Sequence, residues 1–209
     1  NFDIDSIKEF PKIIAETKGL KGLNVTIPYK EDIIPYLDGL SKTAQKIGAV
    51  NTISVGKGKK LKGHNTDHYG FRKSLSPLLE KHHKKALILG TGGASKAIAY
   101  ALRRLKIEFD FVSRNPSEYE LSYEELDTDV FNDYQIIINT TPLGTHPNVD
   151  AYPPLPYDLF TDKHIAFDLV YNPEETAFMK KAKEHGAKVQ NGYEMLVFQA
   201  EKAWKIWHK

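Results

Sequence analysis

A lysine and an aspartate beside two predicted strand ends are the residues of this chain best suited to acid–base chemistry. Lys30 follows the mixed apolar and polar stretch 22–28, and Asp67 closes the polar cluster 63–67. Carbonyl reduction needs a proton donor at the oxygen while hydride reaches the carbon, and a lysine can donate that proton if its pKa is brought toward neutrality. A carboxylate can orient the lysine and hold a substrate hydroxyl. The sequence therefore favours Lys30 and Asp67 as a catalytic pair.

Each of these residues also has an ordinary structural explanation. A lysine shortly after a proline is usually on the surface, and Asp67 within Asn-Thr-Asp can cap the N-terminus of a helix as well as, or instead of, doing chemistry. His64, Asp67 and His68 superficially suggest a metal cluster, but their spacing is no usual zinc pattern and the chain has no cysteine. We therefore expect no metal site.

A glycine turn lies between a short apolar strand at 86–89 and a helix, which is the context of the dinucleotide-binding fingerprint. Gly90 permits the tight turn, and Gly92 lets the backbone approach a pyrophosphate that the helix N-terminus attracts. Ser95 replaces the third glycine of the usual pattern, and Lys96 lacks the neighbours of a phosphate-loop lysine. A glycine turn with a purely structural role is the alternative. The candidate cofactor-binding residues here are Gly90, Thr91, Gly92, Gly93, Ala94 and Ser95.

The end of the next strand, at 109–112, favours NADP over NAD. NAD-binding sites usually carry an acidic residue about 20 positions beyond the glycine turn, where it holds the ribose 2′-hydroxyl. This chain has Ser113 and Arg114 at that place, and a hydroxyl with a guanidinium suits a 2′-phosphate. Asp110 lies nearby, but its position inside the strand makes it a poor ribose ligand. Arg114 as a simple surface arginine is the alternative.

The composition excludes several classes of protein. In 209 residues the chain has 41% hydrophobic and 27% charged residues and a net charge of +2, as in ordinary globular proteins. The absence of cysteine excludes disulfides and thiol catalysis and fits a reducing cytoplasm, where we expect the protein to lie. No apolar run reaches the ~18 residues of a membrane span. The lysine clusters at 57–62 and 81–85 lack interleaved aromatic residues, so we expect no nucleic-acid partner.

Predicted strands and helices alternate almost throughout the chain. We expect helices at about 6–17, 30–47 (interrupted at Pro35), 67–79, 97–105, 174–185 and 194–207, and strands at 22–27, 49–55, 60–64, 86–89, 109–112, 136–138, 165–170 and 187–189. In the strand at 22–27, alternation would turn Leu23, Val25 and Ile27 to one face. The alternation over 86–189 is typical of a doubly wound parallel sheet.

These elements predict an α/β fold with two domains. Residues 1–66 with 192–209 would form an N-terminal α/β substrate domain, and 67–191 a doubly wound Rossmann-like NADP-binding domain. The last helix is too apolar for a free tail and should return to the first domain. Gln199 shares the apolar stripe of that helix, so its amide needs a partner, which could be a substrate hydroxyl or a backbone carbonyl.

Together these motifs resemble those of the shikimate dehydrogenase family. The resemblance covers most of the chain, in GLNVTIPYK at 22–30, GAVNT at 48–52, GHNTDHYG at 63–70, GTGGAS at 90–95, NTTPLG at 139–144, DLVYNP at 168–173 and NGYEMLVFQA at 191–200. It implies NADPH-dependent reduction of 3-dehydroshikimate to shikimate, on the route to aromatic amino acids, by a monomer or homodimer. It also implies Lys30 as the catalytic acid–base and Asp67 as its partner. Matching substrate positions are Thr26, Lys30, Asn51, Asp67, Tyr171 and Gln199, and further cofactor positions are Ser113, Arg114, Asn115, Thr140, Leu169 and Gly192.

Two features depart from the family pattern. The N-terminal strand and its Ser-x-Ser substrate motif are absent, since Ser74-Leu75-Ser76 lies in the helix beyond Asp67, and we expect residues upstream of Asn1 in the native chain. Glu118 stands where the family's phosphate clamp has its second arginine, which predicts a weaker NADP preference. The alternatives are therefore an NAD-preferring quinate/shikimate dehydrogenase and a cofactor-binding module without turnover.

Overall fold

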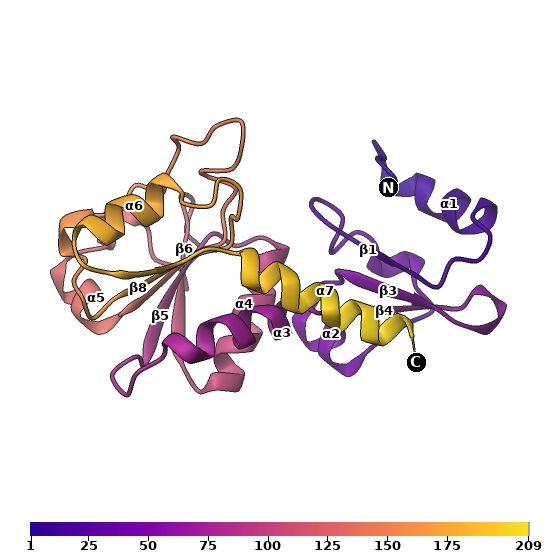
Figure 1. Ribbon diagram of the computed structural model, residues 1–209, viewed down its shortest axis with the longest axis horizontal. Coiled ribbons are helices and arrows are strands. Elements are labelled where there is room, and N and C mark those ends of the chain that lie inside the picture. Colours follow the sequence, from indigo (N-terminus) through magenta and orange to yellow (C-terminus); the bar gives the residue numbers. More distant parts are fainter. Residues whose placement is uncertain (209) are drawn as a thin grey trace.

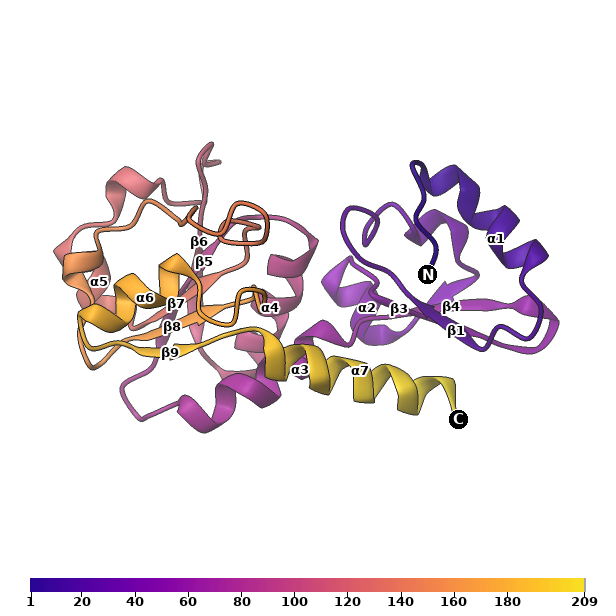
Figure 2. The same ribbon diagram turned by 45° about the horizontal axis from the view of Figure 1, so that its top comes forward.

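The computed structural model describes residues 1–208, which form two α/β lobes joined along a long C-terminal helix (Figure 1). Helix α7 (Tyr193–Trp207) leaves the second lobe and runs beneath the sheet of the first (Figure 2). Its return to the first lobe agrees with the sequence prediction, as does the α/β class. Among residues 1–208 no helix combines the length and apolarity needed to cross a membrane.

The first lobe is built on a small mixed sheet with the strand order β1-β3-β4-β2. The strands β1 and β3 pair antiparallel, as do β3 and β4, whereas β2 and β4 pair parallel. Phe10, Ile33, Val50 and Ile53 form the buried core beneath it. The strands are β1 (Gly22–Asn24), β2 (Gly39–Leu40), β3 (Thr52–Val55) and β4 (Leu61–His64), and the helices are α1 (Phe10–Glu16) and α2 (Lys42–Ile47), with short 3-10 helices at Ile7–Glu9, Ile34–Tyr36 and Lys57–Lys59.

The second lobe contains a parallel sheet with the strand order β6-β5-β7-β8-β9, covered by helices on both faces. Phe71 and Leu102 are buried with one face of the sheet, and Phe131 and Phe178 with the other. Burial on both faces explains the continuous apolar runs of these strands. The strands are β5 (Lys85–Leu89), β6 (Glu108–Val112), β7 (Ile136–Asn139), β8 (Ile165–Asp168) and β9 (Lys188–Gln190), and the helices are α3 (Asp67–Leu75), α4 (Gly93–Leu105), α5 (Thr128–Asp133) and α6 (Ala177–Glu184), with 3-10 turns at Ser76–Leu78, Tyr123–Glu125 and Tyr157–Leu159.

The structure corrects several predicted elements. The strand at 22–27 ends at Asn24, and Ile27 is 72% exposed rather than sharing a buried face. The helix predicted over 30–47 is instead a turn, a 3-10 helix, the strand β2 and the helix α2, because Pro35 cannot continue an α-helical hydrogen-bond ladder. The strand predicted at 49–55 begins only at Thr52, and the helix predicted at 174–185 begins only at Ala177.

Candidate active site

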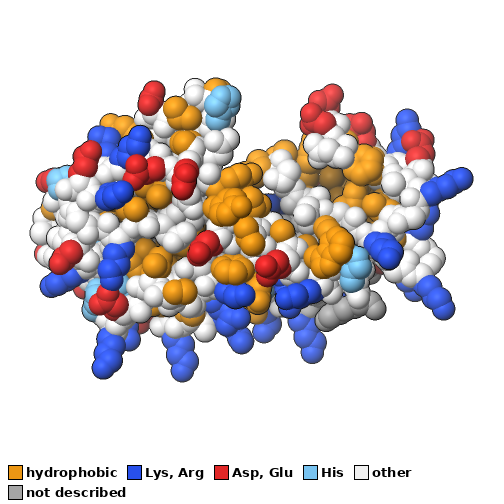
Figure 3. Space-filling view, in the orientation of Figure 1, with side chains coloured by type: hydrophobic (Ala, Val, Ile, Leu, Met, Phe, Trp, Pro, Cys, Tyr) orange, Lys and Arg blue, Asp and Glu red, His pale blue; other side chains and the backbone are white. Residues whose placement is uncertain are grey.

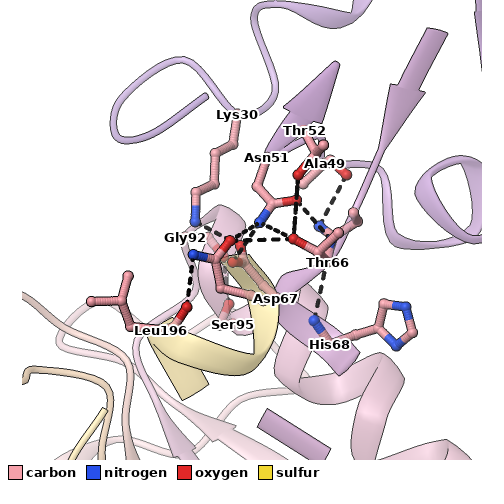
Figure 4. Close-up of polar contacts among 12 residues, drawn as sticks. Lys30, Ala49, Asn51, Thr52, Thr66, Asp67, His68, Gly92, Ser95 and Leu196 are labelled. Atoms are coloured by element: carbon pink, nitrogen blue, oxygen red, sulfur yellow. Dashed lines mark hydrogen bonds and ion pairs between the residues drawn. The ribbon is translucent and has the colours of Figure 1, made fainter. Parts of the chain in front are cut away.

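Lys30 and Asp67 lie together although they come from separate elements of the chain (Figure 4). Lys30 belongs to the turn after β1, and Asp67 is the first residue of α3. The distance between Lys30 Nζ and Asp67 Oδ2 is 2.7 Å, and the two side chains are only 15% and 8% exposed. This arrangement places an ammonium against a carboxylate in a largely desolvated position.

Asn51 contacts the second oxygen of the Asp67 carboxylate and forms a hydrogen-bond network with Thr66 and Gln199. Asn51 Nδ2 donates to Asp67 Oδ1 at 2.7 Å and to Thr66 Oγ1 at 2.9 Å. Gln199 Oε1 lies 3.3 Å from both Asn51 Nδ2 and Thr66 Oγ1, while its own Nε2 donates to the Leu196 carbonyl at 3.0 Å. Of the two partners considered from sequence, the backbone carbonyl is present, and the substrate hydroxyl stays a prediction.

The backbone around the site explains why these side chains converge. The Val50 N–H donates to the Lys30 carbonyl at 2.7 Å, which joins the lysine turn to the start of the β3 segment. Thr66 N donates to Asn51 Oδ1 at 2.7 Å, which joins that segment to the start of α3. Asp67 itself does not cap the helix, contrary to one of the interpretations above. Thr66 occupies the N-cap position, and Asn65 Oδ1 accepts from His68 N at 3.3 Å.

The glycine turn has the geometry that a dinucleotide pyrophosphate requires. Gly90 has φ +97°, which favours glycine, and Gly92 precedes α4 with extended backbone and no side-chain cap. A Cβ placed on Gly92 would meet no atom within 4 Å, so the helix N-terminus opens onto free space. Ser95 is buried and donates to the Gly92 carbonyl at 2.6 Å, so it braces the turn. The residues present therefore fit NADP at this end of the sheet.

The predicted 2′-phosphate residues lie beside this turn. Gly90 N donates to the Val112 carbonyl at 2.9 Å, which brings the end of β6 next to the glycine turn. Arg114 and Asn115 are exposed there, and Ser113 Oγ accepts from Asn115 N at 3.2 Å. The structure thus places the three residues beside the glycine turn, and their role at the adenosine end of the cofactor stays a prediction.

The other predicted site residues lie in the loops after β7 and β8, at the start of α7 and in the turn after β1. Thr140 Oγ1 donates to the Leu89 carbonyl at 2.6 Å, and a Cβ on Gly192 would lie 2.1 Å from the Leu169 oxygen, so Gly192 and Leu169 are in close contact. Thr26 is exposed and Tyr171 is 49% exposed. Within residues 1–208, no hydrogen bond links these two side chains to the Lys30–Asp67 pair.

The two lobes meet next to the Lys30–Asp67 pair. A Cβ on Gly93 would lie 3.5 Å from Lys30 Cβ, and Glu31 forms an ion pair with Lys96 of α4. The space-filling view shows a surface hollowed between the lobes, with hydrophobic side chains gathered beside α7 (Figure 3). Lys30 therefore lies close to the start of α4, where the cofactor is expected.

Sequence reasoning missed several polar residues inside the fold. Asn139, Asp168 and Thr176 form a buried cluster, and burial raises the pKa of Asp168 to about 6. The signal for this cluster in the sequence was a polar residue at the end of each of two otherwise apolar strands.

Burial also lowers the pKa of His68 to about 4, and the ring of this residue lies edge-on to Tyr100. Residues 1–208 contain no group of three or more His, Cys, Asp or Glu side chains placed to hold a metal ion.

Comparisons with known proteins identify the family. The family model described as "Shikimate dehydrogenase substrate binding domain" matches residues 1–53. Two curated relatives, both named shikimate dehydrogenase (NADP(+)), come from Caldicellulosiruptor saccharolyticus (37% identity over 98% of this chain and 78% of the relative) and Methanosphaera stadtmanae (41%, 92% and 74%).

Solved structures give the same result. Shikimate dehydrogenase from Aquifex aeolicus superposes with a TM-score of 0.85 at 38% identity, covering 99% of this chain and 78% of that one. The shikimate 5-dehydrogenase from Thermus thermophilus, solved in complex with NADP(H) and shikimate, gives 0.84 at 34% identity, covering 97% and 78%. With motifs, fold and relatives in agreement, this chain belongs to the shikimate dehydrogenase family.

Proposed function

We propose that this chain catalyses the reversible NADPH-dependent reduction of 3-dehydroshikimate to shikimate, a step of aromatic amino-acid biosynthesis. The observation that carries the proposal is the 2.7 Å contact between Lys30 Nζ and Asp67 Oδ2, in a mostly buried position facing the start of α4. An acid–base pair next to a dinucleotide turn is the minimum machinery for reducing a ketone. The names of the relatives supply the substrate.

In this reaction Lys30 donates the proton that the ketone oxygen acquires. Bound NADPH supplies the hydride that reaches the carbonyl carbon, so that C=O becomes CH–OH. The Asp67 carboxylate orients the Lys30 ammonium group, and its oxygens have lone pairs left to accept a hydrogen bond from a substrate hydroxyl. In the oxidative direction Lys30 takes the proton back. We assign Thr26, Asn51, Tyr171 and Gln199 to binding the remaining polar groups of the substrate.

The residues assigned to NADP lie along the carboxyl edge of the parallel sheet. The turn from Gly90 to Ser95 would hold the pyrophosphate, with Ser113, Arg114 and Asn115 toward the 2′-phosphate. Thr140, Leu169 and Gly192 would lie on the nicotinamide side. Glu118 places a negative charge in the same exposed segment as Arg114 and favours the second candidate function, an NAD-preferring quinate/shikimate dehydrogenase.

A single assay separates these functions. The purified chain is mixed with shikimate or quinate and with NADP⁺ or NAD⁺, and the absorbance of the reduced nicotinamide is followed. Fastest turnover with shikimate and NADP⁺ supports the proposal, whereas fastest turnover with NAD⁺ supports the second candidate. Binding of NADP⁺ without any absorbance change, on a chain carrying any upstream residues, would instead indicate a cofactor-binding module.

We further propose that the chain works in the cytoplasm as a monomer or homodimer on a small-molecule substrate. The absence of cysteine supports a reducing compartment. The scattered lysines, without aromatic residues between them, support the absence of a nucleic-acid partner. Light scattering of the purified protein gives the oligomeric state, and a mass above that of two chains would contradict this assignment.

A further inference from the structure

Asn139 and Asp168 end two neighbouring strands of the parallel sheet, and both are fully buried. The strands β7 and β8 pair in a register that sets these two residues side by side. Asn139 Nδ2 donates to Asp168 Oδ1 at 3.0 Å. Burying a carboxylate to 0% exposure lowers the free energy of unfolding unless hydrogen bonds compensate for the lost hydration.

Every hydrogen bond that Asp168 makes comes from a donor, as a carboxylate requires. Besides Asn139, the Val170 N–H donates to Oδ1 at 3.0 Å, and the Thr176 hydroxyl donates to Oδ2 at 2.7 Å. Thr176 also caps α6 by accepting from Met179 N at 3.3 Å. The carboxylate is thus bonded to Val170 and Thr176, near the two ends of the loop between β8 and α6.

The loop after β7 is held by the same cluster through Asn139. Asn139 Oδ1 accepts from Thr141 N at 3.1 Å and from Thr141 Oγ1 at 2.6 Å. Gly144, at the far end of that loop, has φ +88°, and a Cβ there would contact Thr176 at 3.5 Å. Two strand-end loops, 140–144 and 169–171, therefore depend on one buried amide–carboxylate pair.

These loops lie on the side of the sheet that faces the nicotinamide. The chain order of the strands reverses between β5 and β7, and ligands of such sheets bind at that point, outside the carboxyl ends of the strands. The adenosine residues Ser113 and Arg114 follow β6 on one side, so the nicotinamide half must lie on the side of β7 and β8. Gly192 N donates to the Val170 carbonyl at 3.0 Å, which links the second loop to the helix that carries Gln199.

We propose that Asp168 is a positioning residue, whose buried carboxylate holds the loops 140–144 and 169–171 in the shape that receives the nicotinamide end of the dinucleotide. The proposal rests on the proposed function. Burial raises the pKa of this group to about 6, so at neutral pH the fold keeps a charge that an apolar residue would avoid.

The first test is the substitution Asp168→Asn, measured by steady-state kinetics. Loss of one net hydrogen bond corresponds to about a tenfold change in binding, so the KM for NADPH should rise about tenfold or more. The KM for shikimate should rise by a smaller factor, because Tyr171 is the one residue of these two loops that is assigned to the substrate. Equal changes in both Michaelis constants, or none, would overturn the proposal, because a general loosening of the fold does not distinguish the two ligands.

Thr176 offers a matched pair of variants that does not depend on the stability of Asp168→Asn. Thr176→Ser keeps the hydroxyl that donates to Asp168, whereas Thr176→Val keeps the shape and removes it. We expect a raised KM for NADPH in the valine variant and recovery in the serine variant. The same KM in both would contradict the proposal.

Amide hydrogen exchange of the ligand-free protein tests the role of Asp168 without relying on enzymatic activity, and therefore independently of the proposed function. Asp168→Asn should speed exchange at Thr141 and Val170 by about tenfold or more, and leave the amides of α4 unchanged. If the parent chain shows no turnover, the proposed function fails, yet this exchange experiment still supports or refutes control of the loops by Asp168. Unchanged exchange at both amides would refute it.

Discussion

Replacing Lys30 by alanine should remove the proton donor while most of the hydrogen bonds around it survive. Lys30 contributes the ion pair to Asp67 Oδ2, whereas Asn51 continues to donate to Asp67 Oδ1 at 2.7 Å. Thr66 also keeps its bond to Asn51. The carboxylate would therefore stay in position, with one donor fewer, and the change in rate would report on the missing proton donor.

Two magnitudes follow from this geometry. A positioned general acid contributes about 10²–10⁴ in rate, which is about 3–5 kcal/mol of activation free energy. The same substitution leaves Asp67, 8% exposed, without its cation, and breaking a buried ion pair lowers the free energy of unfolding by about 3–5 kcal/mol. Because 15% of the Lys30 side chain is exposed, water screens part of the loss, so we expect about 1–3 kcal/mol.

The assay is kcat at saturating shikimate and NADP⁺, with denaturant unfolding run in parallel. Lys30→Ala should lower kcat at least about 100-fold, and adding Asp67→Asn should cost little more, because the two residues act as one unit. Lys85→Ala is the matched control. The ion pair between Lys85 and Asp133 is also 2.7 Å long, but it is more exposed and lies at the start of β5, at the end of the strand away from the glycine turn. Unchanged turnover in Lys30→Ala, or losses that multiply in the double variant, would refute the acid–base assignment.

Three further predictions test the cofactor site, the buried acid and the packing between helices. Arg114→Ala should lower the preference for NADP over NAD about tenfold, as for a lost charge-assisted contact, and an unchanged ratio of kcat/KM values would remove Arg114 from the 2′-phosphate site. Because the pKa of Asp168 is raised from 3.8 to about 6, its stabilising effect is present below pH 3.8 and is lost as pH rises through about 6. Relative to Asp168→Asn, the parent should therefore lose up to about 3 kcal/mol of unfolding free energy between pH 4 and pH 7, and parallel pH–stability curves would contradict this. Gly70→Ala places a Cβ 2.4 Å from the Met195 oxygen and should lower the free energy of unfolding by about 1–3 kcal/mol, seen as a lower denaturant midpoint; an unchanged midpoint would contradict the close approach of α3 and α7.

The parallel sheet could be predicted from sequence because its signals are local. Apolar runs of three or four residues, at 86–89, 136–138 and 165–167, are what strands buried on both faces produce. The turn at Gly90 combines a positive φ with a helix start, and both requirements act on neighbouring residues. The same holds for Arg114, which lies two residues beyond Val112, the last residue of β6.

Other features could not be predicted because they depend on partners distant in sequence. The two-residue strand β2 exists only through its pairing with β4, in which Gly39 faces Lys62 and Leu40 faces Gly63. Helix α5 has six residues, which is too short for a recognisable apolar period, and it starts where Asp127 accepts from Val130 N at 3.0 Å. The lateral order of the strands is likewise absent from local patterns, so the pairing of β7 with β8 could not be expected.

The Lys30–Asp67 pair could be predicted in part. The chemistry that Lys30 and Asp67 can perform follows from their amino-acid types, but the distance between them depends on where the start of α3 lies in the fold. Asp67 begins α3, and Phe71, one turn later, is buried in the core of the second lobe. The backbone of Lys30 is bound to the first lobe, because its carbonyl accepts a hydrogen bond from the Val50 N–H. Because Asn51, the next residue, also donates to Asp67 Oδ1 at 2.7 Å, the first lobe holds both members of the pair, and their contact depends on hydrogen bonds between residues that are far apart in the sequence.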